Sequence, residues 1–269
     1  MKDNCIICMV IGKRCKSQYD ALKASLRAYA NKCNADVKLI TDLPDKSMKR
    51  SILAQKLLIP SMFLNYERIA FLDLDIIINK DAPNIFTENT NSAFSACVSP
   101  RSSIGYKNTC RYVWNRPKIL EESNLSYFTD RGFPSNEALN HTINGGVMLM
   151  NPNLIGELFR DAYHSDLPTV SNEEPIAAYI SQINDFFEPL DDRYNAQVIH
   201  ELSSELGLAF RSTQTKYFSL LKKFHRHAPS ILHNKFYPSS YREFIARLVE
   251  KSYIIHFAGN YPYLALRHN

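Results

Sequence analysis

Apolar and amphipathic segments alternate through the first third of the chain. The apolar segments predict buried strands at 5–11, 37–40 and 69–72, and the amphipathic segments predict helices at 19–31 and 52–64. Leu22, Leu26 and Tyr29 fall on one face of the first helix, whereas Pro60 predicts a kink or break in the second. Strands that alternate with helices in this way predict a parallel sheet with helices on its faces.

The remainder of the chain follows a less regular pattern. Further strands are predicted at 92–98, 143–150 and 253–257, and a further helix at 175–183. The glycines Gly145 and Gly146 interrupt the apolar run at 143–150. Residues 100–140 are polar, aromatic and irregular. A structureless segment of that length inside a compact domain is usually functional or mobile.

The composition is that of an ordinary globular protein. The 269 residues are 45% hydrophobic and 22% charged, which fits a single domain spanning residues 1–269. The net charge of +5 suits an anionic ligand but does not require one. The sequence has no apolar run long enough to span a bilayer and no signal-peptide layout, so we expect a cytoplasmic protein.

Six cysteines are present, and Cys5 and Cys8 have the spacing of half a zinc site. Both lie in a predicted strand, where residues three positions apart point to opposite faces, and no second pair is spaced to complete the site. We therefore interpret the cysteines as buried free thiols. Free thiols are in keeping with a reducing cytoplasm.

A pair of acidic residues, Asp73 and Asp75, follows the apolar run at 69–72 and precedes three isoleucines. Open α/β sheets bind ligands at the carboxyl ends of their strands, where two such carboxylates can bind one divalent cation. Oxygen ligands favour Mg²⁺ or Mn²⁺, which would bridge diphosphate oxygens and stabilise a leaving group. The alternative is a pair of solvated acids at a strand end, because Asp-x-Asp is a common pattern.

Haloacid-dehalogenase-type phosphatases also carry Asp-x-Asp after a strand. Their pattern usually stands near the start of the chain and continues with Gly and Thr or Val. Here the pattern begins at residue 73 and continues with isoleucines, which argues against that chemistry.

Four further segments stand before and after the Asp pair: Ala54-Gln-Lys56-Leu, Asn144-Gly145-Gly146-Val, Glu173-Glu174-Pro with the later Tyr194-Asn195, and His256-Phe-Ala-Gly259. In order and rough spacing, the chain resembles the GT-A glycosyltransferases, and most closely glycosyltransferase family 8, which includes glycogenin and bacterial lipooligosaccharide galactosyltransferases. The resemblance implies an α/β, Rossmann-like GT-A fold with a single mixed, mostly parallel sheet flanked by helices.

The resemblance implies donor contacts for two of these segments. Lys56 lies seventeen residues before Asp73, where the family places a cation near the donor phosphate or sugar. The alternative for Lys56 is a surface lysine on a helix. Asn144 corresponds to an Asn that hydrogen-bonds sugar hydroxyls, and Gly145 and Gly146 let the backbone approach a ligand closely. The alternative for the glycines is a bulge or turn.

The family carries Asp-Gln where this chain has Glu173 and Glu174. In a retaining transferase, a carboxylate beside the anomeric carbon can act as nucleophile or stabilise an oxocarbenium ion, by analogy with glycosidases. The resemblance therefore makes both glutamates candidate catalytic residues, together with Lys56. The alternative is an ordinary helix N-terminus, where acidic residues are favoured.

The resemblance also implies the third metal ligand. The family's His-x-x-Gly corresponds to His256 and Gly259, and its histidine completes the metal site. A neutral imidazole is a suitable ligand beside the carboxylates of Asp73 and Asp75, so we expect Mn²⁺ or Mg²⁺ on these three side chains. The family continues with Lys-Pro-Trp, whose lysine contacts the diphosphate. This chain lacks that lysine, and Arg267 is the candidate substitute.

In the GT-A fold the first strand and the loop after it hold the nucleotide. We therefore expect backbone contacts to the base from Val10 and Ile11, with Leu74 and Gly259 also in the donor site. Tyr19 is a candidate for stacking on the base, and the alternative is an aromatic residue in the helix core. The resemblance implies a UDP-sugar donor more often than any other.

The insertion at 100–140 is rich in aromatic residues and cations, namely Arg101, Tyr106, Lys107, Arg111, Tyr112, Trp114 and Arg116. Such residues suit a glycan acceptor, for example a bacterial surface polysaccharide or lipooligosaccharide. The alternative is an ordinary solvated insertion.

Residues 216–251 hold eight Lys or Arg against two Glu, with aromatic residues between them. The segment 218–227 has amphipathic helical spacing, which allows peripheral contact with an anionic membrane or packing on the domain with a solvated basic face. No nucleic-acid-binding motif is present, so we expect no nucleic-acid partner.

The sequence thus predicts a metal-dependent glycosyltransferase that uses a nucleotide-sugar donor and retains configuration. One alternative is a nucleotidyltransferase on a related sheet, of which Gly12-Lys13-Arg14 is only a faint sign. The other is an inactive relative that binds glycans.

Overall fold

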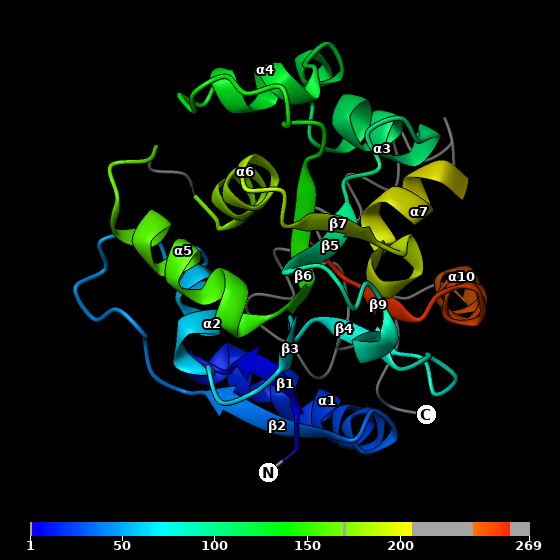
Figure 1. The fold of residues 1–269 in the computed structure, drawn as a ribbon. Helices are drawn as coiled ribbons and strands as arrows, with labels where there is room; N and C mark the ends of the chain where they lie inside the picture. The colour runs from blue at the N-terminus through cyan, green and yellow to red at the C-terminus, as the bar shows by residue number, and fades with distance from the viewer. Residues whose placement is uncertain (1, 169–170, 206–238, 259–269) are drawn as a thin grey trace.

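A six-stranded mixed sheet forms the centre of the computed structural model, which describes residues 2–168, 171–205 and 239–258 (Figure 1). Its strands are β1 (Asn4–Met9), β2 (Ala35–Ile40), β3 (Arg68–Leu72), β5 (Phe94–Val98), β6 (Ile143–Met150) and β7 (Phe187–Leu190). They lie in the order β2-β1-β3-β6-β5-β7. The five strands predicted up to residue 150 are all present, and β7 was not predicted.

Strand β6 runs antiparallel to both of its neighbours, whereas β1 is parallel to β2 and β3, and β5 is parallel to β7. The reversal brings the start of β6 beside the carboxyl end of β3, with Val147 opposite Leu72. The Asp73 amide then donates to the Gly146 carbonyl at 2.8 Å. Against β5 the register of β6 shifts between Ala96 and Cys97, which is a bulge in β6 that contains the glycine pair.

The helices of the fold have the following bounds: α1 (Gly12–Lys32), α2 (Ile59–Met62), α3 (Ile104–Asn108), α4 (Asn124–Thr129), α5 (Pro152–His164), α6 (Glu174–Ile183), α7 (Val198–Glu205) and α10 (Ser239–Lys251). Short 3₁₀ turns are η1 (Ala54–Leu58), η2 (Ile85–Thr87), η4 (Pro117–Leu120) and η5 (Asp192–Asn195), and η3 (Thr109–Val113) is a π-helical turn. The helix predicted at 52–64 is broken into η1 and α2, and Pro60 is the second residue of α2, as expected for a proline-induced break.

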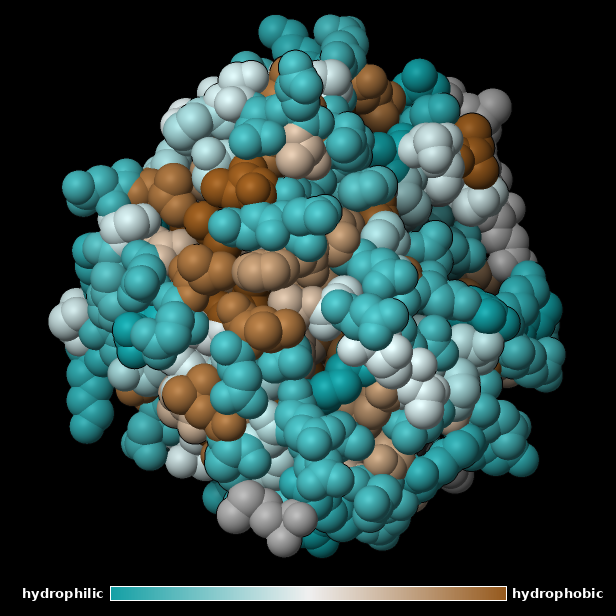
Figure 2. All heavy atoms as spheres, viewed as in Figure 1, coloured by the Kyte–Doolittle hydropathy of each residue, from teal (hydrophilic) through white to brown (hydrophobic). Residues whose placement is uncertain are grey.

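The two faces of the sheet are covered by different helices. Side chains from η1, α2, α4, α5 and α6 pack on one face in a core cluster that includes Cys5 and Ile7. Helix α1 packs on the other face, in a cluster that includes Ile6 and Cys8. Cys5 and Cys8 therefore point to opposite faces as free buried thiols, as predicted. Figure 2 shows apolar side chains gathered over α5 and α6 on the viewed face.

A second, three-stranded sheet was not predicted. It consists of β4 (Ile76–Ile78), β9 (Ile254–His256) and β8 (Ala196–Gln197), with β9 in the middle. Helices α7 and α10 pack on it through a third core cluster (Figure 1). Pairing of β9 with β4 places His256 opposite Ile76, directly after the Asp pair. The small sheet therefore joins the end of the described chain to the central sheet.

The insertion at 100–140 is more ordered than the sequence indicates. It folds into α3, η3, η4 and α4 rather than a structureless loop, although none of these elements exceeds six residues. Ser103 and Ser123 cap the two α-helices by accepting from backbone amides. Of the basic stretch at 216–251, only α10 is described, and the predicted amphipathic segment 218–227 lies outside the described residues. None of the described helices combines the length and apolar character needed to cross a bilayer.

Candidate active site

Three candidate metal ligands meet at the carboxyl end of β3. Asp73 and Asp75 lie in the loop between β3 and β4, and His256 ends β9. One ligand atom from each of the three lies within 4.8 Å of the others. The His256 Nε2 is 3.4 Å from the Asp75 Oδ1 and 3.7 Å from the Asp73 Oδ2. The sequence separation of 181 residues is closed by the β4–β9 pairing, which also lets the Phe257 amide donate to the Asp75 carbonyl at 2.8 Å.

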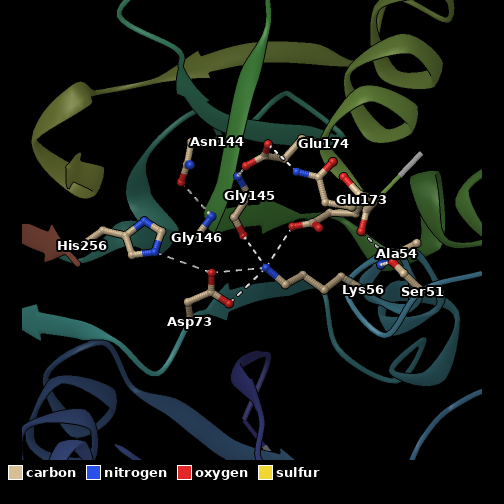
Figure 3. Close-up of polar contacts among 12 residues, drawn as sticks. Ser51, Ala54, Lys56, Asp73, Asn144, Gly145, Gly146, Glu173, Glu174 and His256 are labelled. Carbon is tan, nitrogen blue, oxygen red and sulfur yellow. Dashed lines mark hydrogen bonds and ion pairs between the residues drawn. The ribbon is translucent and has the colours of Figure 1, made fainter. Parts of the chain in front are cut away.

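The ammonium of Lys56 lies between the metal-ligand group and the glutamates of α6 (Figure 3). Its Nζ is 3.0 Å from the Asp73 Oδ1, 2.8 Å from the Glu173 Oε1 and 3.2 Å from the Gly145 carbonyl oxygen. An ammonium has three N–H donors, so these three acceptors use its whole capacity. Lys56 is buried rather than exposed on a helix surface. A contact with a donor phosphate or sugar would require it to release one of these acceptors.

The two glutamates at the start of α6, Glu173 buried and Glu174 half-buried, have different partners. Glu173 pairs with Lys56, whereas Glu174 accepts from the Gly145 amide through Oε1 at 2.9 Å. The other oxygen of Glu174 accepts from the Asn172 side chain at 2.7 Å. Glu174 is therefore held in one orientation by two donors beside the glycine pair of β6.

Each glycine of the pair leaves room for one side chain of the site. A Cβ placed on Gly145 would come within 2.1 Å of the Glu173 Oε1, and a Cβ on Gly146 within 2.3 Å of the His256 Cε1. Neither glycine has a positive φ, so the requirement is for space rather than for a left-handed backbone. The bulge, which was the alternative at the sequence level, is present, and the space beside the two glycines is taken by Glu173 and His256.

A chain of side-chain amides lies behind His256. The Asn144 Oδ1 accepts from the Gly146 amide at 3.1 Å and from the Asn195 Nδ2 at 2.7 Å. The Asn195 Oδ1 is 3.0 Å from the His256 Nδ1. The Oδ1 of Asn144 is thus already engaged, and its Nδ2 lies 3.5 Å from the Gln197 Oε1.

Negative charge exceeds positive charge in this cluster. Four carboxylates, those of Asp73, Asp75, Glu173 and Glu174, surround the single ammonium of Lys56. Burial raises the pKa of Glu173 to about 7, because the attraction of Lys56 is shared with Asp73 and Glu174 is a close like charge. Burial also raises the pKa of Glu174, against the opposing effect of the Gly145 amide. The excess of carboxylates favours a bound cation.

The pKa values of the other charged groups follow from the same competition. Burial alone would lower the pKa of Lys56, but the charges of Asp73 and Glu173 raise it above its ordinary value. Burial would likewise lower the pKa of His256 and raise that of Asp75, but their mutual contact has the opposite effect and prevails in both. At neutral pH, Lys56 is therefore a fixed cation and Asp75 a fixed anion.

The residues present fit a divalent cation. Two carboxylates and one imidazole form a ligand set that suits Mn²⁺. The carboxylate oxygens of the same set suit Mg²⁺. The side of His256 away from the carboxylates is occupied by Asn195, so Nε2 is the nitrogen available to a metal. In the described part of the chain, these three side chains are the one such group of acidic, His or Cys residues.

The other residues predicted to contact the donor lie in several different places. Val10 and Ile11 follow β1 at the same edge of the sheet, with the Val10 amide donating to the Ile40 carbonyl. Tyr19 packs partly buried against the α1-side core, which supports its interpretation as a helix-core residue. The side chain of Leu74 is buried in that core, so only its backbone is available to a donor. Gly259 and Arg267 lie outside the described residues.

In the insertion, the predicted acceptor residue Arg101 already has a protein partner, which it shares with Arg131, a residue that was not singled out. Arg101 and Arg131 both pair with Glu122, and the guanidinium of Arg131 lies 3.8 Å from the centroid of the Tyr127 ring. Glu174 is a close enough charge to contribute to the raised pKa of Tyr127, after burial as the main cause. Arg101, Arg131, Glu122 and Tyr127 therefore form one folded cluster within the insertion. Tyr106 is buried and contributes to the core instead.

Sequence reasoning missed two side chains of the site and undervalued a third. Asn172 and Gln197 were not singled out, and Asn195 was noted only as half of an aromatic–Asn pair. Asn172 could have been found because it is a polar residue directly before the predicted Glu173. The role of Asn195 depends on contacts with residues 51 and 61 positions away, which no local pattern encodes.

Comparison with known proteins bears on the fold. No family model and no curated protein sequence matches the chain. Among solved structures, a glycosyltransferase involved in the glycosylation of the major capsid of PBCV-1 aligns with a TM-score of 0.52 and 12% identity, over 98% of this chain and 97% of that one. The likeness confirms the GT-A fold predicted from the sequence. At this identity it shows the fold alone.

Two other glycosyltransferases align with lower scores. The galactosyltransferase LgtC, in complex with donor and acceptor sugar analogues, aligns with a TM-score of 0.46 and 9% identity over 95% of this chain and 87% of its own. GlyE of Streptococcus pneumoniae aligns with a TM-score of 0.44 and 13% identity over 96% of this chain and 55% of its own. Membership of family 8 stays a prediction.

Proposed function

We propose that this protein transfers a sugar from a nucleotide-sugar donor to a glycan acceptor in a reaction that depends on Mn²⁺ or Mg²⁺. The observation that carries the proposal is the convergence of Asp73, Asp75 and His256 at the carboxyl end of β3, with the carboxylates of Glu173 and Glu174 close by. A metal-ligand group and a second acidic group, joined by one lysine, suit a reaction in which a diphosphate leaves and a cationic sugar centre develops.

Asp73, Asp75 and His256 would hold the metal ion. When bound, such an ion neutralises charge on the diphosphate and so assists its departure. Lys56 has a different task, since it holds Asp73 and Glu173 in fixed positions and balances part of their charge. This gives the buried lysine a role in preorganising the site without a direct phosphate contact.

Glu174 is the carboxylate that we assign to the sugar's anomeric centre. Its two oxygens are oriented by the Gly145 amide and the Asn172 side chain, beside the glycine pair of β6. A carboxylate held in this way can stabilise a developing oxocarbenium ion or attack it, which is consistent with retention of configuration. Glu173 is less suited to this task because Lys56 already occupies it.

The donor is a UDP-sugar in this proposal, with Val10, Ile11 and the backbone of Leu74 beside the nucleotide. The acceptor is a glycan, such as a bacterial surface polysaccharide or lipooligosaccharide. We assign acceptor binding to the cluster of Arg101, Arg131 and Tyr127, in which two guanidinium groups lie over an aromatic ring. Aromatic faces suit the apolar faces of sugar rings, and the arginines suit acidic or phosphorylated glycans.

A donor screen with mass-spectrometric detection tests the proposal. Nucleotide-sugars are incubated with the protein and Mn²⁺, and release of the nucleoside diphosphate is compared with and without EDTA. We expect one donor class to be hydrolysed or transferred in a metal-dependent way, with at least a 100-fold loss in Asp75→Asn, a loss of roughly the size expected for a metal ligand. Turnover that resists EDTA, or full activity in Asp75→Asn, contradicts the proposal.

A further inference from the structure

We infer that Asn195 is a positioning residue that selects the metal-binding form of His256 through a chain of hydrogen bonds that starts at the backbone of Gly146. The chain runs from the Gly146 amide to Asn144, then to Asn195, and ends on the Nδ1 of His256. The inference rests on the proposed function in one respect, which is that a metal ion binds the His256 Nε2.

The first link fixes the orientation of Asn144. The Gly146 amide lies 3.1 Å from the atom that it contacts on the Asn144 side chain. A backbone N–H can only donate, so that atom is the amide oxygen rather than the amide nitrogen. The main chain of β6 thereby determines which way the Asn144 side chain faces.

The second link fixes Asn195 in turn. The same Asn144 oxygen lies 2.7 Å from the Asn195 side chain, and an oxygen acceptor requires a donor there. The nitrogen of the Asn195 amide therefore faces Asn144, and its oxygen faces His256 at 3.0 Å. Reversal of Asn195 would set two oxygens against each other across 2.7 Å.

The third link sets the proton on His256. An amide oxygen only accepts, so the His256 Nδ1 must carry the hydrogen. The Nε2 of the neutral ring is then left with a free lone pair, and it faces Asp73 and Asp75 at 3.7 and 3.4 Å. This is the form that a metal ion requires, because a ligating nitrogen cannot carry a proton.

Burial and strand pairing make this selection effective. Asn195 and His256 are each 4% exposed, so water has little access to replace either partner. Asn195 precedes β8, which pairs with β9 in a register that places Ala196 opposite Ile255. The backbone therefore holds the acceptor of Asn195 beside the imidazole.

A structural role alone would have different consequences. If Asn195 only fills space beside β6, its removal costs stability without changing which nitrogen of His256 carries the proton. Gln182 offers a matched control. It is a buried side-chain amide, 7% exposed, that bonds the carbonyls of His141 and Ala178 away from the site.

The test uses NMR of the ¹⁵N-labelled full chain without metal, with His256→Gln to identify the resonance of the ring. We expect an Nδ1–H signal of His256 that is protected from solvent exchange in the wild type and in Gln182→Ala. Asn195→Ala should lose this protected signal. Asn195→Asp should retain it, since a carboxylate also accepts from Nδ1.

Titration with Mn²⁺ followed by electron paramagnetic resonance supplies the second readout. Asn195→Ala should bind Mn²⁺ about 10- to 100-fold more weakly than wild type, as is typical when the partner of a metal-ligating histidine is lost. Gln182→Ala should bind it as tightly as wild type does. A protected Nδ1–H in Asn195→Ala, or unchanged Mn²⁺ affinity in that variant, overturns the inference.

The two proposals can fail separately. If the wild type binds no Mn²⁺ but shows the protected Nδ1–H, and Asn195→Ala loses it, the positioning role stands and the metal assignment of the proposed function fails. If the wild type binds Mn²⁺ but has no proton on the His256 Nδ1, the positioning role fails and the metal site stands.

Discussion

Gly146 and His256 lie in van der Waals contact across the site, so closely that a Cβ on residue 146 would sit 2.3 Å from the His256 Cε1. The two residues are 110 positions apart in the sequence, and β6 and β9 belong to different sheets. The position of the imidazole therefore depends on the absence of a side chain at residue 146.

Gly146→Ala should displace the imidazole from Asp73 and Asp75. The backbone of Gly146 suits any residue, so the variant should fold, with a stability loss of about 1–3 kcal/mol from overpacking. We expect an affinity for Mn²⁺ that is weaker by roughly tenfold or more, because a displaced imidazole no longer points at the metal ion. Isothermal titration with Mn²⁺ measures the affinity, and wild-type affinity in a folded Gly146→Ala protein would contradict the assignment of His256.

The neighbouring substitution Gly145→Ala should have a different effect. Its Cβ would reach within 2.1 Å of the Glu173 Oε1 and would separate that carboxylate from Lys56, while His256 keeps its place. We expect donor turnover to fall more than Mn²⁺ affinity does. The two alanine variants, assayed in parallel for metal binding and turnover, should therefore show opposite patterns, and identical patterns would count against separate roles for the two glycines.

Lys56→Met should destabilise the fold strongly. The substitution leaves Glu173 buried without its cation, a situation that typically costs about 3–5 kcal/mol. Adding Glu173→Gln removes the unpaired charge and should recover part of the loss. Urea unfolding of the single and double variants measures both effects, and a Lys56→Met protein as stable as wild type would show that the pair contributes little.

His200 should make stability depend on pH on the acid side. Burial lowers its pKa from 6.5 to about 4, and the ring lies against Tyr106 and Trp114. As the pH falls below 6.5, the unfolded chain binds a proton that the folded chain does not bind until about pH 4. The free energy of unfolding should thus decrease across this window, by about 3 kcal/mol at most.

His200→Asn isolates this contribution, because the variant should lose stability at every pH but without the same decrease between pH 6.5 and 4. Urea unfolding followed by circular dichroism measures both proteins. In the wild type, fluorescence of Trp114, the single tryptophan, reports on the same region. Parallel stability curves for the two proteins would show that His200 does not titrate in this window.

The sequence was sufficient to predict several parts of the fold that depend on local patterns, although the 13-residue helix α5 was not predicted. Apolar runs identified β1 and β3, and the two-residue period of a strand gave the opposite directions of Cys5 and Cys8. The short helices α3 and α4 were not predicted, because helices of five or six residues depend on tertiary contacts rather than on their own periodicity. The pairing of β9 with β4 could not be predicted either, because it joins two short strands that are far apart in the sequence.

In the site, the charged residues were recognisable by type, but their contacts were not. Nothing in the local sequence distinguishes a buried lysine with three acceptors, such as Lys56, from one on a surface. Leu74 was expected beside the donor because of its neighbours, yet alternation along the chain turns its side chain into the core. The link between Asn195 and His256 depends on the pairing of β8 with β9, which only the folded chain reveals.

The pairing of β9 with β4 also has a consequence for the order of folding. The central sheet uses no residue beyond Leu190, whereas the third ligand of the site arrives with the strand Ile254–His256. Contacts between segments so far apart form late, because closing a long loop is entropically costly. A chain still emerging from the ribosome can therefore assemble its sheet and its two aspartates, but it acquires a complete ligand set only when the last described strand docks.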